Sequence, residues 1–463
     1  NDRMYRRIKI LYDKKGIFFF IANKRIVALI AKSLIAGYRQ LKKYDTIILN
    51  MKIKLSLKNI VLSVSVLIVI TILIAITILG IKNKKPTAVF YGISERNVSE
   101  ITKVLQSTYS RKNKKLPYNI IVLNSKESLE SALKKAKKAD LLFMYNGANA
   151  EYAASLNKKR HLGFDATILD EMSSSIRNCV LVSDEKISCV PLLIDHYEVD
   201  VNLSKFTSSG IPAIETLSDL ELLATKTKSS TMAPIVIPVG NAYDFVNIFG
   251  ALVEATSGTQ AYLNAASKIR NNISQGKISQ AEFQKLISEM DSQGSELYAA
   301  LSLLKKWIAI EILPKNLLQL SNDDIKNFMS SNLTAISFMN LSQHRTFERE
   351  TISKFSSIFI PPADISMNSN RRLCAPVILA IQLKKNKTVK NSVQKMATSL
   401  QGELSMKTGL APVARSSRIP DKQADDVRYW VASSGTPVYG FSELFVNEST
   451  RTSFANALKS FLK

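Results

Sequence analysis

The chain contains few of the residues that build metal sites and disulfide-stapled folds. Its 463 residues include only three cysteines and three histidines. A small disulfide scaffold is therefore excluded. The histidines form no H-E-x-x-H motif and no pair spaced by four residues, so a zinc site would need ligands from scattered positions. We expect no metal site.

Sequence signatures of catalysis and nucleotide binding are also missing. With 16 glycines, the chain contains no G-x-x-x-x-G-K-[ST] loop, no G-x-G-x-x-G turn and no G-x-S-x-G elbow. These motifs cradle phosphates or present a nucleophile. Acidic residues are numerous, but no pair has a spacing that indicates a general acid and base. The sequence therefore predicts a protein that is not an enzyme and binds no cofactor.

Acidic residues are scarce at the N-terminal end, and most of the positive net charge of the chain therefore lies there. The net charge is +25, and residues 1–50 account for +9 of it and residues 51–85 for a further +6. The rest of the chain mixes both signs. An excess of Lys and Arg beside a hydrophobic segment is typical of membrane topology. We therefore expect no nucleic-acid partner.

That hydrophobic segment, Ile60–Ile81, is 22 residues long and contains no charged residue, Asn, Gln or Pro. A helix of this length spans about 33 Å, enough for a bilayer core of about 30 Å. We predict a transmembrane helix at residues 59–81. The run is longer than a signal-peptide core and lacks a small-x-small cleavage site, which favours a retained anchor over a cleaved signal.

Basic residues before the helix place the N-terminus inside and the main domain on the extracytoplasmic, periplasmic side of the cytoplasmic (inner) membrane. Residues 1–58 form a basic N-terminal segment. Met51 opens a charged stretch typical of a natural start, so residues 1–50 are expected to be an upstream extension of the reading frame. The alternative is a short basic cytoplasmic arm.

After Pro86 the pattern alternates between strands and helices. Apolar runs predict strands at Thr87–Tyr91, Asn119–Leu123 and Asp140–Met144, with helical stretches between them. This order is typical of an α/β domain with mainly parallel strands. Ligands of such domains bind at the carboxyl ends of the strands. Tyr145 and Asn146 follow one of these strands.

A hairpin follows, with Cys179 and Cys189 at its two ends. A loop with an odd number of residues, centred on Asp184, would place the two cysteines opposite each other. This pattern predicts a possible disulfide in an oxidising compartment. Two reduced strand cysteines are the alternative. Residues 200–320 are mainly helical, and two later strands are expected at Leu333–Met339 and Arg371–Ile381. No internal repeat is present.

Six stretches, in order over residues 87–413, resemble the extracellular solute-binding proteins of bacterial ABC importers, sugar-type family. Asp184–Pro191 is similar to the family's hairpin before the first hinge strand, Val199–Asn202 to that strand, and Gly210–Leu220 to its G-I-x-x-P segment. The others are the helix Leu303–Pro314 with the later segment Phe328–Ile336, the strand and helix of Cys374–Leu400, and the crossover Gly409–Val413. The sequence departs from the family pattern at four points: Glu185 replaces Gly, Leu217 replaces Trp, the glycine of the F-x-x-G-k segment is absent from Phe328–Ile336, and a membrane helix replaces the lipidation cysteine.

The resemblance implies a two-lobed α/β fold of the periplasmic-binding-protein type (type II-like) preceded by one transmembrane helix. Lobe one would comprise residues 86–198 plus 372–412, and lobe two residues 202–368 plus 413–463. The expected function is a membrane-anchored, monomeric solute-binding protein that captures a sugar or similar polar solute and delivers it to ABC permease subunits. The alternative is a sensor or a structural envelope protein built on the same fold.

Aromatic rings stack on sugar rings, and Asn or Asp side chains bind hydroxyl groups. The residues of these types that follow strands or lie near the crossings are the candidate ligand-binding set: Tyr145, Asn146, His196, Tyr197, Asn241, Tyr243, Asn340 and Trp430.

Overall fold

The computed structural model describes residues 85–108, 118–123, 125–135, 139–155, 162–183, 185–313, 316, 319–370, 376–433 and 439–463, with 67, 68, 70 and 71. The basic segment 1–58 and nearly all of the predicted transmembrane helix lie outside these residues. Within the described part, no helix is both long and apolar enough to span a membrane. The chain divides into two compact units, residues 1–84 and 85–463. All elements named below belong to the second.

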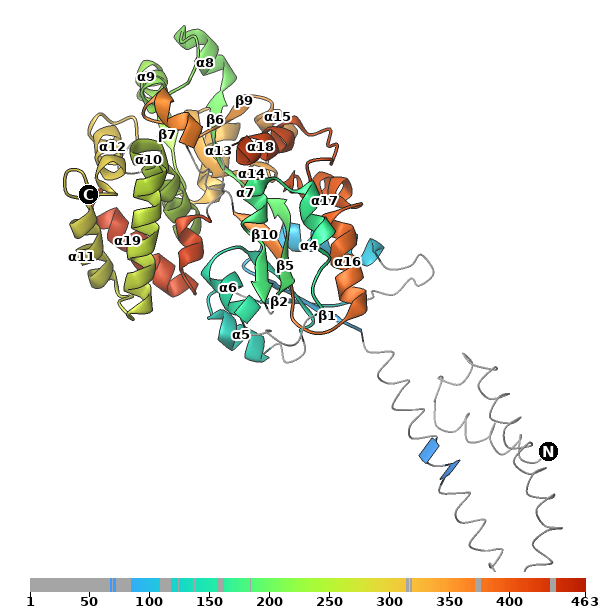
Figure 1. The fold of residues 1–463 in the computed structure, drawn as a ribbon. Helices are drawn as coiled ribbons and strands as arrows, with labels where there is room; N and C mark the ends of the chain where they lie inside the picture. The colour runs from blue at the N-terminus through green and yellow to red at the C-terminus, as the bar shows by residue number, and fades with distance from the viewer. Residues whose placement is uncertain are drawn as a thin grey trace, which may run out of the picture. The chain divides into compact units, whose positions relative to one another are not determined.

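The first sheet of this unit has the strand order β11-β5-β10-β3-β1-β2, with β4 paired to β5 (Figure 1). The three N-terminal strands are parallel, with Ala88 opposite both Ile120 and Leu141; they are β1 (Thr87–Tyr91), β2 (Asn119–Leu123) and β3 (Leu141–Tyr145). The later strands all pair antiparallel: β4 (Leu181–Ser183), β5 (Lys186–Ile194), β10 (Val377–Gln382) and β11 (Ala411–Pro412). The sheet is thus mixed rather than mainly parallel.

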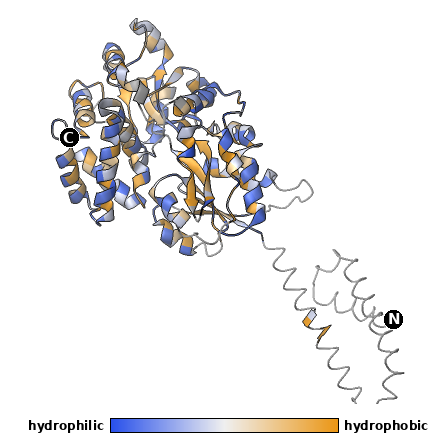
Figure 2. Ribbon diagram, in the orientation of Figure 1, coloured by the Kyte–Doolittle hydropathy of each residue, from blue (hydrophilic) through white to orange (hydrophobic). Residues whose placement is uncertain are grey.

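Helices cover the faces of this sheet because its central strands are buried along their length. Figure 1 shows α16 and α17 beside α4. These and the other helices of lobe one are α4 (Glu95–Ser107), α5 (Leu129–Lys135), α6 (Ala148–Ser155), η2 (Ala166–Glu171), α7 (Ser174–Arg177), α16 (Lys387–Ala397) and α17 (Gln401–Thr408). Figure 2 shows the strands as hydrophobic and the helix exteriors as largely hydrophilic.

The second sheet has the order β7-β8-β6-β9. Strands β7 (Ala233–Val236) and β8 (Thr334–Asn340) are parallel, and β6 (Tyr197–Asn202) runs antiparallel to β8 and to β9 (Phe355–Phe359). The accompanying elements of lobe two are α8 (Leu203–Ser209), α9 (Leu217–Thr227), α10 (Ala242–Ser274), α11 (Gln280–Met290), α12 (Tyr298–Ala309), α13 (Asn322–Ser330), α14 (Leu341–His344), α15 (Arg349–Ile352), η4 (Ile365–Asn370), η5 (Phe441–Leu444) and α19 (Glu448–Ser460).

Several of these helices begin where the sequence places a capping box. Thr216, Ser279 and Ser321 each accept a hydrogen bond from the backbone three residues on, and the acid at that position bonds back. Such caps contribute about 1 kcal/mol each. Helix α10 kinks at Gly258, whose φ is 84°. Trp307 and Phe283 are among the fully buried side chains of this lobe.

The chain passes from one sheet to the other at Asp195 and His196, directly between β5 and β6. All of β6 therefore belongs to lobe two, and the predicted boundary at residues 198–202 is a few residues late. A second passage lies between η4 and β10, partly outside the described residues. The expected assignment of all of residues 413–463 to lobe two is also wrong. Helix α18 (Lys422–Ser433) buries Ala424, Val427 and Val431 in the core of lobe one.

The hairpin register differs from the predicted one. Leu181, not Cys179, lies opposite Cys189, because the ladder shifts between Leu181 and Val182. Cys179 and Cys189 are both buried free thiols, so the structure has the reduced alternative rather than the disulfide. The Asn146 amide contacts the Cys179 sulfur at 3.8 Å. Burial raises the pKa of Cys179 to about 12, which leaves this thiol protonated and poorly reactive.

Candidate functional site

A cavity of about 280 Å³ lies between the two lobes. Lobe one contributes the carboxyl ends of β1 and β3, and lobe two contributes the first residues of α10, η5 and the start of α19. Its lining is rich in amides and tyrosines: Tyr91, Gly92, Ser125, Met144, Tyr145, Asn146, Asn149, Asn241, Ala242, Tyr243, Ser442, Glu443, Phe445, Asn447, Glu448 and Arg451. The position agrees with the rule that ligands bind beyond the carboxyl ends of strands.

Two tyrosines, one from each lobe, face each other at this cavity. The ring centroids of Tyr145 and Tyr243 are 6.1 Å apart, and the ring planes are inclined by 35°. The Arg451 guanidinium lies 5.0 Å from the centre of the Tyr243 ring, within cation–π range. The Tyr243 hydroxyl donates a hydrogen bond to Glu443 Oε1. An aromatic pair, a cation and a carboxylate therefore meet in one small volume.

Helix α10 holds the Glu443 segment in place. Ser442 donates its backbone N–H to Asn247 Oδ1 at 2.8 Å and its hydroxyl to the Tyr243 carbonyl at 2.6 Å. Burial raises the pKa of Glu443 to about 7, although the Tyr243 hydrogen bond and Arg451 oppose that shift. Both protonation states of Glu443 are thus populated near neutral pH. Burial also holds the pKa of Tyr145 and of Tyr243 well above the ordinary value, so both hydroxyls stay protonated.

The two predicted asparagines in the cavity also shape its walls. Asn146 Oδ1 accepts the backbone N–H of Val377 at 3.0 Å, which joins the end of β3 to the start of β10. Asn241 caps α10 by accepting the N–H groups of Tyr243 and Asp244 at 3.0 and 3.3 Å. Their oxygens are therefore already engaged, and we expect them to position the lining more than to bind a ligand directly.

The lobes touch around the cavity. A Cβ atom on Gly147, whose φ is 127°, would lie 2.6 Å from both Cβ and the carbonyl oxygen of Glu443. Asn149 donates to the carbonyl oxygens of Phe445 and Val446 at 3.4 and 3.3 Å. The Arg270 guanidinium of α10 pairs with Glu151 of α6. The two lobes are thus in direct contact around the cavity.

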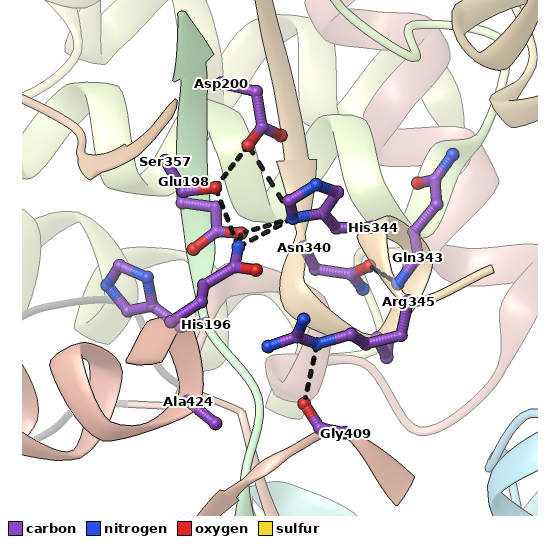
Figure 3. A network of polar contacts seen from close by, with 12 residues as sticks. His196, Glu198, Asp200, Asn340, Gln343, His344, Arg345, Ser357, Gly409 and Ala424 are labelled. Carbon is purple, nitrogen blue, oxygen red and sulfur yellow. Dashed lines mark hydrogen bonds and ion pairs between the residues drawn. The ribbon is translucent and has the colours of Figure 1, made fainter. Parts of the chain in front are cut away.

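The other four predicted residues do not line this cavity. Tyr197 is buried, with its hydroxyl donating to Asp244 Oδ1 at 2.8 Å. Asn340 caps α14 by accepting the Gln343 N–H at 2.9 Å. His196 packs against Trp430 with ring centroids 5.6 Å apart, and Trp430 also contacts Phe359 at 5.9 Å. Figure 3 shows His196 and Asn340 beside a buried polar network at the crossing between lobes.

Sequence reasoning missed Glu443 and Arg451. Both belong to the last 25 residues, whose place beside β1 and β3 depends on how α19 docks on α10 and α11. One local signal was present: Asn447 precedes a helical stretch and caps it by accepting the Thr450 N–H at 2.9 Å. A helix beginning there would place Glu448 and Arg451 on adjacent turns of one end.

A second cavity, of about 380 Å³, lies on the other side of Gly147. It shares Asn146 with the first, and aliphatic side chains contribute much of its lining, among them Leu181, Leu263, Leu379 and Leu444. This lining offers fewer groups for a hydroxylated ligand, so the first cavity is the better candidate site.

Comparison with known proteins identifies the fold. No family model matches the chain, and no curated protein matches it in sequence. Among solved structures, a chitin oligosaccharide binding protein is similar over 81% of this chain and 98% of its own, with 11% identity and a TM-score of 0.57. The maltose-bound MalE3 of T. maritima matches with the same coverage, 13% identity and a TM-score of 0.55. The bacterial solute receptor AcbH, described as preferring β-D-galactopyranose, has 12% identity over 82% of this chain and 97% of its own, with a TM-score of 0.55.

This chain therefore has the fold of the two-lobed solute-binding proteins. The resemblance inferred from the six sequence stretches is confirmed. These structural neighbours are binding proteins rather than enzymes, in agreement with the expectation from the sequence.

Proposed function

We propose that the chain is a sugar-type solute-binding protein that closes its lobes around a small polar solute in the cavity between Tyr145 and Tyr243. The observation that carries this proposal is the convergence of aromatic, amide and charged groups from both lobes on one cavity. A ligand favours the closed state only by binding it more tightly than the open one. Contacts from both lobes meet that requirement.

The lining fits a hydroxylated ligand. Tyrosine rings supply apolar faces for the C–H face of a sugar ring, and Glu443 with Arg451 can accept from and donate to hydroxyl groups. The volume of about 280 Å³ lies at the lower end of the range of small-molecule sites, about 300–1,000 Å³. We therefore expect a solute of one or two sugar units rather than a long oligosaccharide.

The cellular part of the proposal comes from the sequence. The uncharged run Ile60–Ile81 would anchor the protein in the cytoplasmic membrane, with the lobes on the extracytoplasmic side. ABC permease subunits would then receive the solute. N-terminal sequencing of the native protein tests the anchor: a mature start near Lys82–Pro86 would mean that the segment is removed.

A thermal-shift screen of the full chain tests solute binding. The panel contains monosaccharides, disaccharides, longer oligosaccharides, polyols and amino acids. A specific ligand at 100 times its dissociation constant should stabilise the folded state by about 2.7 kcal/mol. We expect the largest shifts from monosaccharides or disaccharides. If no solute shifts the transition, capture of a small solute is contradicted and a structural envelope role is favoured.

A further inference from the structure

A second cluster of charged side chains lies apart from the cavity, at the crossing between the lobes. Glu198 and Asp200 alternate on β6 and so point to the same face of the sheet. His344 comes from α14, which directly follows the neighbouring strand β8. All three side chains are buried, with exposures of 0%, 0% and 2%. Figure 3 shows Glu198, Asp200 and His344 converging on one point.

The distances between the nitrogen and oxygen atoms of these side chains are similar to the ligand-to-ligand distances around a bound metal ion. His344 Nδ1 lies 3.5 Å from Glu198 Oε1 and 3.7 Å from Asp200 Oδ1, and the potential ligand atoms all lie within 4.8 Å of one another. Zinc binds oxygen and nitrogen at about 2.0–2.2 Å, so neighbouring ligand atoms in a tetrahedron are about 3.3–3.6 Å apart. The distance from His344 Nδ1 to Glu198 Oε1, 3.5 Å, falls within that range, and the distance to Asp200 Oδ1, 3.7 Å, lies just above it.

The hydrogen bonds of the cluster are incomplete. Among the described residues, the outer atoms Glu198 Oε2, Asp200 Oδ2 and His344 Nε2 are buried and have no hydrogen-bond partner, whereas the three atoms that face one another are contacted by Gln423 and Ser357. The Gln423 Nε2 group of α18 contacts three groups: Glu198 Oε1, His344 Nδ1 at 2.6 Å and Ser357 Oγ at 2.7 Å. An amide nitrogen has only two hydrogens. At most two of these three contacts can therefore each have a hydrogen of its own. A small cation in place of the NH₂ group could bind all three neighbouring atoms.

The cluster also has an excess of negative charge, which favours a bound cation. Two carboxylates face one imidazole, and burying an uncompensated charge is costly. The Arg345 guanidinium acts on Glu198 only at a distance, because its own contacts are with other groups: it pairs with Asp421 Oδ1 at 2.6 Å. It also donates to the Gly409 carbonyl at 3.0 Å (Figure 3). A divalent cation would neutralise Glu198 and Asp200 with His344 left neutral, the form in which it can act as a ligand.

We propose that Glu198, Asp200 and His344 form a site for a divalent transition-metal ion, with Zn²⁺ the best match to one imidazole and two carboxylates. Rotating the Gln423 amide by half a turn presents its oxygen in place of its nitrogen as a fourth ligand. Gln423 and Ser357 are partly exposed whereas the three ligands are buried, so the ion enters from the α18 side.

The site would link the lobes at their crossing. Its three principal ligands belong to lobe two, whereas Gln423 is carried by α18, which packs on the core of lobe one. A bound ion would therefore hold α18 against β6 and β9. It would do so without taking part in solute binding, because none of these residues lines the cavity between the lobes.

The test measures zinc binding directly. The full chain is stripped with a chelator, dialysed, and titrated with Zn²⁺ by calorimetry, with the bound metal counted by mass spectrometry. We expect one Zn²⁺ per chain. Glu198→Gln and His344→Asn should each weaken binding by more than about 100-fold, because even residues that only orient ligands contribute 10–100-fold. His196→Asn is the matched control, because it removes a neighbouring buried histidine outside the cluster.

Two further measurements keep the proposal falsifiable if a buried substitution impairs folding. Co²⁺ in place of Zn²⁺ should give the visible absorption of a tetrahedral site in the unmodified chain, and the spectrum should change in Gln423→Ala, a partly exposed position. Failure of the unmodified chain to bind Zn²⁺ or Co²⁺ would overturn the proposal. So would zinc affinity that Glu198→Gln and His344→Asn leave equal to that of the His196→Asn control.

Discussion

The interlobe cavity and the Glu198–Asp200–His344 cluster are both polar sites at the junction of the lobes, but their charges are arranged differently. In the cavity, one carboxylate, Glu443, lies near one cation, Arg451, and accepts a hydrogen bond from the Tyr243 hydroxyl, although Glu443 Oε2 and Arg451 Nε have no hydrogen-bond partner among the described residues. In the cluster, two carboxylates face one histidine, and Glu198 Oε2, Asp200 Oδ2 and His344 Nε2 lack partners within the described part of the chain. The cavity, which is partly open and has one cation beside one carboxylate, suits a neutral solute that binds reversibly. An unbalanced, closed site suits a resident cation.

The two sites also depend differently on lobe closure. The cavity is formed by residues of both lobes that meet around Gly147, so opening the lobes would dismantle it. Most of the cluster lies within lobe two, on β6, β9 and α14. Substitutions at the lobe contact should therefore separate the two sites experimentally.

The largest expected effect is on stability and follows from the raised pKa of Glu443. A carboxyl whose folded pKa is about 7, above its ordinary value of about 4.5, destabilises the fold as pH rises between these two values. Glu443→Gln removes the ionisation. The variant should gain up to about 3 kcal/mol in free energy of unfolding relative to the unmodified chain over that range.

Urea unfolding at a series of pH values measures this difference, with Glu289→Gln on the exposed face of α11 as a control that should not change the pH profile. Equal pH profiles for Glu443→Gln and the unmodified chain would show that Glu443 is not the group titrating there.

A smaller effect is expected from Gly147→Ala, which introduces a Cβ at the contact with Glu443. The clash and the positive φ should disfavour closure by about 1–3 kcal/mol, weakening solute affinity about 5- to 150-fold. Zinc affinity should change much less, because three of its four proposed ligands lie in lobe two. Gly210→Ala is the control, because its φ is also positive at 68° but no heavy atom lies within 4 Å of the added Cβ. Calorimetry with solute and with Zn²⁺ compares the two variants; loss of both affinities in Gly147→Ala would contradict the separation of the sites.

The smallest effect is expected from Arg270→Gln, which breaks the ion pair with Glu151 between α10 and α6. Both side chains are more than one-third exposed, so solvent screening limits the contribution to less than about 1 kcal/mol. Thermal unfolding and solute titration should both change little. A loss of solute affinity above about tenfold would show that this pair, rather than the Gly147 contact, controls closure.

Local sequence patterns predicted the main strands of the fold. The residues that line the cavity depend instead on packing between segments far apart in the sequence. Strands β1 and β2 begin and end where their apolar runs do, and the residues after the predicted strand Asp140–Met144 led to Tyr145, which the structure places as the last residue of β3. Trp430 was expected beside Tyr145 from the opposite lobe, but α18 returns to lobe one and carries Trp430 to the crossing. Glu443 and Arg451 carry no local signature of binding, since only the docking of α19 brings them to β1 and β3.

The most direct test of the central claim compares two aromatic substitutions for the solute identified by thermal shift. Tyr243→Ala removes a ring that lines the cavity, whereas Trp430→Ala removes a larger ring that lies outside it. Isothermal titration of the full chain should show one solute per chain. Tyr243→Ala should weaken its dissociation constant about 5- to 150-fold, a loss of about 1–3 kcal/mol, while Trp430→Ala should leave it nearly unchanged. Equal affinity of Tyr243→Ala and the unmodified chain, with circular dichroism confirming both folds, would contradict the assignment of the cavity as the solute site.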